Sequence, residues 1–188
     1  MLLGYNMKKI SIVIVVILII LAVFYIISNI SERKLKGELT DNMIEDTKID
    51  LIVVEKAKRT LSIYDNGTLV KSYKISLGKN PVGHKQFEGD SKTPEGIYYI
   101  DGKNPKSKYF LNLGISYPNE KDKEYAASQG KSAGGAIKIH GLPNGFSLAK
   151  PLFNIYGDWT EGCIAVNNED MAELYNIIDI GTKIEIKP

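Results

Sequence analysis

Short apolar runs with strand character dominate the chain from residue 49 onward. Residues 51–54 are apolar and mostly β-branched, and residues 61–64 and 69–77 alternate between apolar and polar positions. The two alternating runs flank Asn66 and Gly67, a pair that accepts the positive φ angles of a tight hairpin turn. Further strand candidates occupy residues 97–100, 109–115, 136–140 and 183–186. This pattern predicts a mostly β domain of the sandwich or barrel type.

Helical periodicity is clear in one segment. Asn167 or Asn168 is a good capping residue for a helix. The apolar stripe of that helix is expected to consist of Met171, Leu174, Ile177 and Ile178. The charged segment 119–130 is expected to form a short surface helix with a solvated face. One or two helices should therefore accompany the strands.

The N-terminal part of the chain has a different character. Residues 10–27 carry no charge and only Ser11 as a clearly polar side chain, close to the about 20 apolar residues that cross a bilayer as a helix. A buried core helix would normally show a polar face, and this segment has none. We therefore expect a transmembrane or signal-anchor helix at 10–27, an N-terminal flank at 1–9, a juxtamembrane linker at 28–48 and the β-rich domain at 49–188. A retained anchor is favoured, because the apolar run exceeds the core of a typical cleaved signal peptide.

Composition narrows the function classes. The chain has 188 residues, 24% of them charged, and a formal net charge of +2. Its lysines are scattered, whereas a nucleic-acid-binding domain shows a basic patch or stripe, so no nucleic-acid partner is expected. Two histidines and one cysteine offer no recognisable ligand spacing, so neither a metal nor another cofactor is predicted.

His140 and Cys163 are the candidate catalytic pair. Thiol catalysis needs a thiolate nucleophile and a base, and imidazole suits the second role because its unperturbed pKa of about 6.5 lies near neutrality. Cys163 follows Gly162, whose backbone can turn sharply. The N–H groups of Gly162 and Cys163 are expected to stabilise the oxyanion formed by attack on a carbonyl. A lone cysteine is more often a small buried hydrophobe, and only the histidine and the flanking motifs favour the nucleophile.

An ordered set of motifs surrounds this pair. His140-Gly141 is followed some twenty residues later by Thr160-x-Gly162-Cys163-Ile164. The other motifs are Gly-Asp-Ser-Lys-Thr-Pro-Glu-Gly at 89–96, Ile-Ser-Tyr-Pro-Asn at 115–119 and Gly-Thr-Lys-Ile-Glu-Ile at 181–186. Together they resemble the L,D-transpeptidase (YkuD-type) catalytic domain, a family of cysteine enzymes that remodel bacterial peptidoglycan. The resemblance implies an L,D-transpeptidase-like β-sandwich or barrel.

The resemblance also implies a mechanism. Cys163 would be the nucleophile and His140 the general base, and the resulting ion pair would keep the thiolate populated. The thiolate would attack the carbonyl at the L-centre of the third, diamino-acid residue of a peptide stem, and the thioester would pass to an amine. A backbone carbonyl is expected to bind the second ring nitrogen of His140, with Asp158 as the alternative.

Several further residues are predicted to line the substrate cleft. They are Tyr117, Gly141, Asp158, Trp159, Thr160 and Glu161. A buried position in the sheet is the alternative for Tyr117, and a core anchor is the alternative for Trp159. Asp158 and Glu161 would raise the thiol pKa and attract a cationic amine, such as that of diaminopimelate. Thr160 is expected to hydrogen-bond within the nucleophile loop.

Three loop features complete the prediction. The segment 78–96 either borders the cleft, as the resemblance implies, or is a plain connecting loop, and the segment 142–157 is a candidate lid. His84 is a rival base, although its neighbours indicate a mobile surface site.

Two positions depart from the pattern. Glu161 stands where many family members carry histidine, and Ala165 stands where many carry arginine. The form Trp-Thr-x-Gly-Cys-Ile-Ala resembles a subgroup in which some members hydrolyse the bond. A hydrolytic L,D-carboxypeptidase or amidase is therefore one alternative, and a non-catalytic wall-binding module is another. A sortase is disfavoured because Arg59 is the only arginine in the domain, and a zinc peptidase because ligand spacing is lacking.

The resemblance also sets the expected partners. They are peptidoglycan stem peptides, a membrane through residues 10–27, and carbapenem-type inhibitors. The chain is expected to be a monomer, anchored in a membrane with the catalytic domain outside the cytoplasm, in the periplasm or cell wall.

Overall fold

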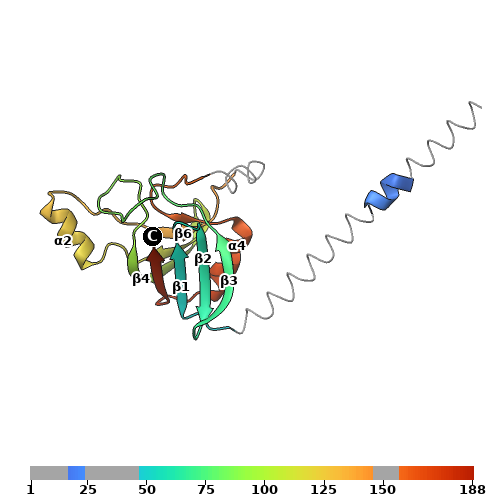
Figure 1. Cartoon of the computed structure of the whole chain (residues 1–188), viewed down its shortest axis with the longest axis horizontal. Coiled ribbons are helices and arrows are strands. Elements are labelled where there is room, and N and C mark those ends of the chain that lie inside the picture. The colour runs from blue at the N-terminus through green and yellow to red at the C-terminus, as the bar shows by residue number, and fades with distance from the viewer. Residues whose placement is uncertain (1–16, 24–46, 146–156) are drawn as a thin grey trace, which may run out of the picture. The chain divides into compact units, whose positions relative to one another are not determined.

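The computed structural model describes residues 17–23, 47–145 and 157–188. The strands all belong to the unit Thr47–Pro188 (Figure 1). Of the predicted anchor at 10–27, only residues 17–23 are described, and they are helical. The rest of that segment, most of the predicted linker and residues 146–156 of the candidate lid lie outside the described residues. Among the described helices, none has the length and apolarity needed to cross a membrane.

Eight strands of the described chain hydrogen-bond in the order β3-β2-β1-β8-β4-β5-β6-β7. They are β1 (Leu51–Glu55), β2 (Thr60–Asp65), β3 (Thr68–Lys74), β4 (Gly96–Ser107), β5 (Phe110–Ile115), β6 (Lys138–His140), β7 (Ile164–Ala165) and β8 (Lys183–Lys187). The β1–β8 and β6–β7 pairs are parallel, and the other pairs are antiparallel. The predicted strands are all present, and β4 continues well beyond the predicted 97–100.

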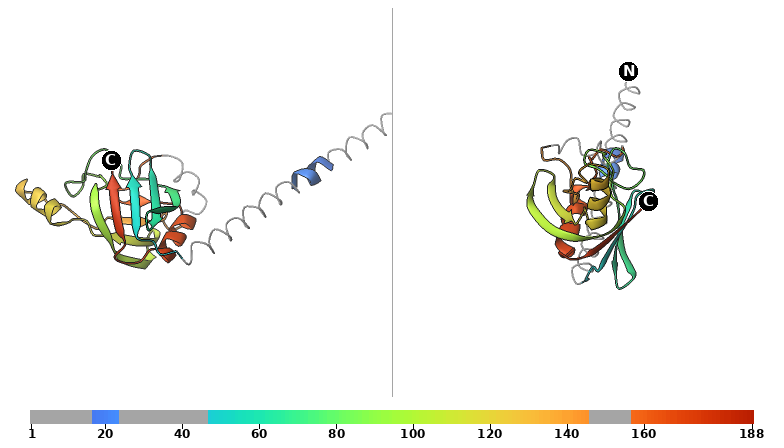
Figure 2. Two further views of the ribbon diagram at one scale, coloured as in Figure 1. Left: turned by 60° about the horizontal axis from the view of Figure 1, so that its bottom comes forward. Right: turned by 90° about the vertical axis from the view of Figure 1, so that its left-hand side faces the viewer.

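The long strand β4 joins the two halves of the sheet. Its first residues pair with β8, and its later residues pair with β5. The β4–β5 register shifts twice, and such irregularities bend and twist a strand pair. The strands are visibly curved in Figure 2.

Two isolated bridges link the ends of the strand order. Ser76, just after β3, bridges Ala165 on β7, and Gly78 bridges Thr160. The strands therefore return on themselves, as the sandwich or barrel prediction requires. The mostly β architecture is confirmed.

Side-chain alternation places the core on one face of the strands. In β1, Ile52 and Val54 are fully buried, while their neighbours are half-buried. Their partners on β8, Ile184 and Ile186, are buried in the same register. Residues that extend this core include Leu61, Ile63, Tyr98, Ile100, Leu113, Ile115, Ile139 and Ile164.

The helices α2 (Glu120–Ser128) and α4 (Asn168–Ile177) lie on opposite sides of the strands (Figures 1 and 2). The predicted cap Asn167 accepts the backbone N–H of Asp170, and α4 buries Met171 and Leu174 in the core. The surface helix predicted within 119–130 is α2. Its charges are not all solvated, however, because Asp122 is buried.

Candidate active site

The pairing of β6 with β7 brings the candidate pair together. Ile139 lies opposite Ile164, and His140 lies opposite Ala165. Cys163 directly precedes β7, so the parallel pairing holds it beside β6, the strand that ends at His140. Both residues line one pocket of about 640 Å³. The thiol is half-buried, and its Sγ lies 3.7 Å from the carbonyl oxygen of Ala136.

The backbone before the cysteine takes a conformation that glycine favours. Gly162 has a φ of 127°, and a Cβ at this position would lie 2.5 Å from the carbonyl oxygen of Lys92. The hydroxyl of Thr160 fixes the rest of the turn. Its Oγ1 donates to the Cys163 carbonyl at 2.7 Å and accepts the Gly162 N–H at 3.1 Å. The predicted hydrogen bonding of Thr160 within the nucleophile loop is confirmed.

His140 is held by its neighbour. Its Nδ1 lies 2.7 Å from the carbonyl oxygen of Gly141. A carbonyl can only accept, so Nδ1 carries the proton and Nε2 of the neutral ring keeps its lone pair, as a general base requires. The Gly141 N–H in turn donates to the carbonyls of Tyr109 and Leu111. The predicted backbone-carbonyl partner is confirmed, and Gly141 acts through its backbone.

Two aromatic rings cover the imidazole. The Tyr109 ring centroid lies 4.6 Å from that of His140, and the Trp159 centroid lies 5.6 Å away in an edge-on arrangement. His140 is consequently only 4% exposed, although it lines the pocket. Trp159 is therefore part of the pocket wall.

Burial sets the charge state of the pair. Burial lowers the pKa of His140, and the nearby charge of Lys138 lowers this pKa further. The hydrogen bond to Gly141 acts in the opposite direction and raises it. Burial also raises the pKa of the Cys163 thiol, although the Lys138 backbone N–H and ammonium oppose this shift. Both directions favour a neutral thiol beside a neutral imidazole, because a low-dielectric site disfavours each charge. This differs from the expectation of a standing thiolate–imidazolium pair.

The two predicted oxyanion donors differ in their surroundings. The Gly162 N–H is engaged by Thr160. The Cys163 N–H makes no hydrogen bond within the described residues. Of the two backbone N–H groups, that of Cys163 is therefore the better placed to bind an oxyanion.

Three of the predicted cleft residues, Gly141, Tyr117 and Asp158, do not line the Cys163 pocket. Tyr117 is 4% exposed, and its hydroxyl donates to the Ala133 carbonyl at 3.0 Å. This agrees with the alternative prediction, a tyrosine buried in the sheet. Asp158 forms a bidentate ion pair with Arg59 and accepts the Leu77 N–H at 2.9 Å. Asp158 therefore organises the closure of the strands and does not contact His140.

The charge around the pocket is opposite to the expectation. Glu161 lines it, but this carboxylate pairs with Lys79 and accepts a hydrogen bond from Ser91. The other charged side chains lining the pocket all belong to lysines, namely Lys79 itself, Lys106, Lys108 and Lys138. The pocket is therefore basic, and attraction of a cationic amine by Asp158 and Glu161 is not what the structure supports.

Sequence reasoning missed the wall opposite the nucleophile. The hairpin between β4 and β5 contributes Lys106, Lys108 and Tyr109 to the pocket, and Asn112 on β5 lies directly across from His140. The available signal was Asn112 itself, a buried polar residue inside an otherwise apolar run.

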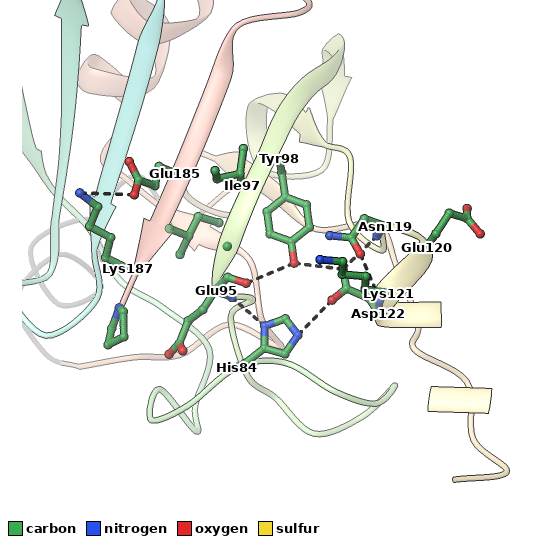
Figure 3. Close-up of a pocket in the computed structure, with 13 residues that line it drawn as sticks. His84, Glu95, Ile97, Tyr98, Asn119, Glu120, Lys121, Asp122, Glu185 and Lys187 are labelled. Atoms are coloured by element: carbon green, nitrogen blue, oxygen red, sulfur yellow. Dashed lines mark hydrogen bonds and ion pairs between the residues drawn. The ribbon is translucent and has the colours of Figure 1, made fainter. Parts of the chain in front are cut away.

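A second pocket, of about 870 Å³, surrounds the other histidine (Figure 3). His84 Nδ1 accepts the Glu95 N–H at 2.9 Å, so Nε2 carries the proton and donates to Asp122 Oδ1 at 3.1 Å. The Tyr98 hydroxyl donates to the other Asp122 oxygen at 3.0 Å. The prediction of a mobile surface site was wrong, because both ring nitrogens are engaged. His84 does not line the Cys163 pocket.

One family model covers almost the whole β-rich unit of the chain. The family model described as "L,D-transpeptidase catalytic domain" (YkuD) matches residues 49–186. The chain belongs to the L,D-transpeptidase family. The predicted family and the extent of the resemblance are confirmed.

Relatives of the chain carry names from the same family. The chain is 28% identical to "Putative L,D-transpeptidase YafK" of Escherichia coli, over 68% of this chain and 46% of that protein. It is 30% identical to "Putative L,D-transpeptidase YkuD" of Bacillus licheniformis, over 73% of this chain and 65% of that protein. The chain thus spans about half to two thirds of these curated relatives.

Solved structures show the same fold. The helical cell shape determining protein Pgp2 (K307A mutant) of Campylobacter jejuni superposes with a TM-score of 0.58 at 30% identity, covering 76% of this chain and 49% of Pgp2. Bd1075 of Bdellovibrio bacteriovorus superposes with a TM-score of 0.51 at 28% identity, covering 74% of this chain and 48% of Bd1075. Each match covers about half of the other protein's chain.

Proposed function

We propose that this L,D-transpeptidase-family protein is a peptidoglycan-remodelling cysteine acyltransferase that works through a thioester at Cys163. The observation that carries the proposal is the tautomer of His140. Its Nδ1–H donates to the Gly141 carbonyl, so its basic nitrogen is left for the pocket that it shares with the only cysteine of the chain. Family membership supports the peptidoglycan substrate.

The acylation step follows from these positions. As the substrate carbonyl approaches, the thiol proton passes to Nε2 of His140, and Sγ forms a bond to the carbonyl carbon at the L-centre of the third, diamino-acid residue. The Cys163 N–H supports the oxyanion. The C–N bond then breaks, the departing amine takes the proton from His140, and a thioester remains.

Deacylation reverses the proton path. An amine from another stem or from a protein gives a proton to His140 as it attacks the thioester carbonyl. The C–S bond breaks, the departing Cys163 thiolate takes the proton from His140, and the new amide bond is the cross-link or protein attachment. Because the thiol and imidazole are both neutral at rest, the pair returns to its starting state after each cycle.

Hydrolysis is the second candidate outcome. Water in place of the amine would make the protein an L,D-carboxypeptidase or amidase. Supporting features are the Trp-Thr-x-Gly-Cys-Ile-Ala motif and the absence of the histidine that many members carry at the position of Glu161. Pgp2, a structural relative, is named as a cell shape determinant, which also fits remodelling of the wall.

We also propose that residues 10–27 anchor the chain in a membrane and that the catalytic domain works outside the cytoplasm. The support is the uncharged apolar run and the wall-directed family. Protease accessibility of the domain in cells stripped of their wall and of any outer membrane, compared with lysed cells, tests this orientation. Protection of the domain in the stripped cells would contradict it.

The test of function uses the full chain in detergent with tetrapeptide-stem muropeptides and mass spectrometry of the products. Dimers support transfer to an amine, and tripeptides support hydrolysis. Cys163→Ala should abolish both while binding to purified wall persists, and Cys163→Ser serves as the matched control for shape. A carbapenem should add its mass to the wild type at Cys163 and not to either variant. Unchanged turnover in Cys163→Ala would contradict the thioester at Cys163, and a wild type that binds the wall without any turnover would leave only a wall-binding role.

A further inference from the structure

Three lysine side chains in the Cys163 pocket have no ion-pair partner among the described residues. They are Lys106, Lys108 and Lys138. The fourth lysine of the pocket, Lys79, pairs with Glu161. Many lysines elsewhere in the domain do have carboxylate partners, such as Lys56, Lys71 and Lys85. Uncompensated positive charge is therefore gathered around the nucleophile.

The chain segment that joins the two catalytic strands does not supply the missing anions. Residues 146–156 read Phe-Ser-Leu-Ala-Lys-Pro-Leu-Phe-Asn-Ile-Tyr and contain no aspartate or glutamate. They add one more lysine.

Lys138 is the best placed of the three. It precedes His140 by two residues on β6, so its side chain points to the same face as the imidazole. It directly precedes Ile139, the partner of Ile164, so it lies beside Cys163, and its charge is felt at both proposed catalytic groups. Lys138 is half-buried, whereas Lys108 is exposed in the turn between β4 and β5 at the rim of the pocket. A half-buried ammonium gains more from an anionic partner than an exposed one, because solvent screens it less.

We propose that Lys138, with Lys108 at the rim, binds a carboxylate of the acyl donor beside the scissile carbonyl. The inference rests on the proposed function and specifies its substrate class: stem peptides with a free carboxylate within one residue of the bond that breaks. Two carboxylates meet this description. One ends the fourth residue, on the leaving group, and the other belongs to the side chain of a diamino acid such as diaminopimelate at the third position.

The same contact would orient the donor. A charge-assisted hydrogen bond from an ammonium is stronger than a neutral one. Anchoring a group one residue from the reacting carbon restricts the carbonyl to the vicinity of Sγ. Lys138 thus acts as a substrate-binding residue, and it does not take part in proton transfer.

The experiment compares three donors on the full chain in detergent. The first is a tetrapeptide-stem muropeptide with both carboxylates free, the second has the C-terminal carboxylate amidated, and the third has the third-residue side-chain carboxylate amidated. For each donor, kcat and KM are measured by mass spectrometry. The wild type should prefer the free acid over one of the amides by about 10- to 100-fold in kcat/KM, the size of one charged hydrogen bond.

The variants then test the residue. Lys138→Met should reduce that preference to a few-fold, mainly through KM, and Lys138→Arg should restore most of it. Lys121→Met, an exposed lysine on α2 outside the pocket, is the matched control and should keep the full preference. The ratio of kcat/KM between two donors cancels any effect of Lys138 on the thiol pKa, because that effect changes kcat/KM equally for both donors.

The outcomes separate the two proposals. A wild type that converts none of the donors contradicts the proposed function itself. A wild type that converts acid and amides equally, or a Lys138→Met variant with the full preference, overturns the carboxylate site while the function stands. The amide that the wild type rejects identifies which carboxylate the lysine binds.

Discussion

Replacing Thr160 by valine should disorganise the nucleophile loop. The Thr160 side chain is 4% exposed and joins two backbone groups, the Gly162 N–H and the Cys163 carbonyl. Valine has nearly the same shape, so it opens no cavity, but it removes both hydrogen bonds. Each buried polar group left without a partner costs about 1–3 kcal/mol. We therefore expect a loss of about 2–5 kcal/mol in the free energy of unfolding.

The loss of acylation rate should be larger than that caused by a mutation far from Cys163 that lowers the free energy of unfolding by the same amount. The two hydrogen bonds fix Gly162 and Cys163, the proposed nucleophile. A displacement of about 1 Å at a reacting atom can lower the rate by about 100-fold. Carbapenem acylation of the full chain, followed by mass spectrometry, measures this rate directly. Trp159 is the only tryptophan of the chain and lies beside His140, so its fluorescence reports unfolding near the site.

Thr160→Ser is the matched control, because it keeps the hydroxyl and removes only a methyl group. It should retain most of the acylation rate and lose about 1 kcal/mol of stability. Equal stability and equal acylation in the valine and serine variants would refute the role assigned to the hydroxyl. Faster acylation in Thr160→Val would mean that the released Gly162 N–H serves the oxyanion, which contradicts the assignment of that N–H to the loop.

The remaining predictions concern the histidine and its supports. Burial lowers the pKa of His140, so the neutral base persists below the ordinary imidazole range, and the acylation rate should fall only as pH drops through this lowered pKa. Because the unfolded chain binds this proton more readily than the folded one, stability should be unaffected by His140 above about pH 6.5 and should fall as pH drops from there toward the lowered pKa. A pH series of denaturation midpoints checks this. Gly141→Ala would place a Cβ 2.7 Å from Asn168 Oδ1 and should cost about 1–3 kcal/mol by overpacking, visible as a lower midpoint. Lys56→Met strips the buried ammonium from Glu95 and two carbonyls and should cost about 3 kcal/mol, with faster proteolysis of the 83–95 segment; an unchanged digestion rate would argue against this clamp.

Local sequence signals predicted the parts of the fold that depend on neighbours in the chain. Asn66 and Gly67 have φ angles of 47° and 81°, as their hairpin turn requires. Asn167 caps α4 through its own side chain. His140 and Cys163 were found by residue type and motif, and the backbone partner of the imidazole is the very next residue.

Features that depend on distant pairing were not predictable. Asp158 is close to Cys163 in sequence, yet its charge is directed to Arg59, 99 residues away, because the strands close there. The hairpin that carries Lys108 reaches the pocket because β4 runs on through Gly102 and two register shifts. Gly102 and Pro105 interrupt the apolar pattern, so the sequence indicated a short strand and left the basic wall unseen.

Ala165, two residues after Cys163, pairs with Ser76, and this pairing bears on when the proposed active site forms. Ser76 and Ala165 exchange two backbone hydrogen bonds of 2.8 Å each, and this contact fixes the strand that follows the sulfur. Because the two partners are 89 positions apart, a chain whose strands have not yet closed carries Cys163 without this support. The proposed nucleophile would then reach its final position only after most of the domain has folded.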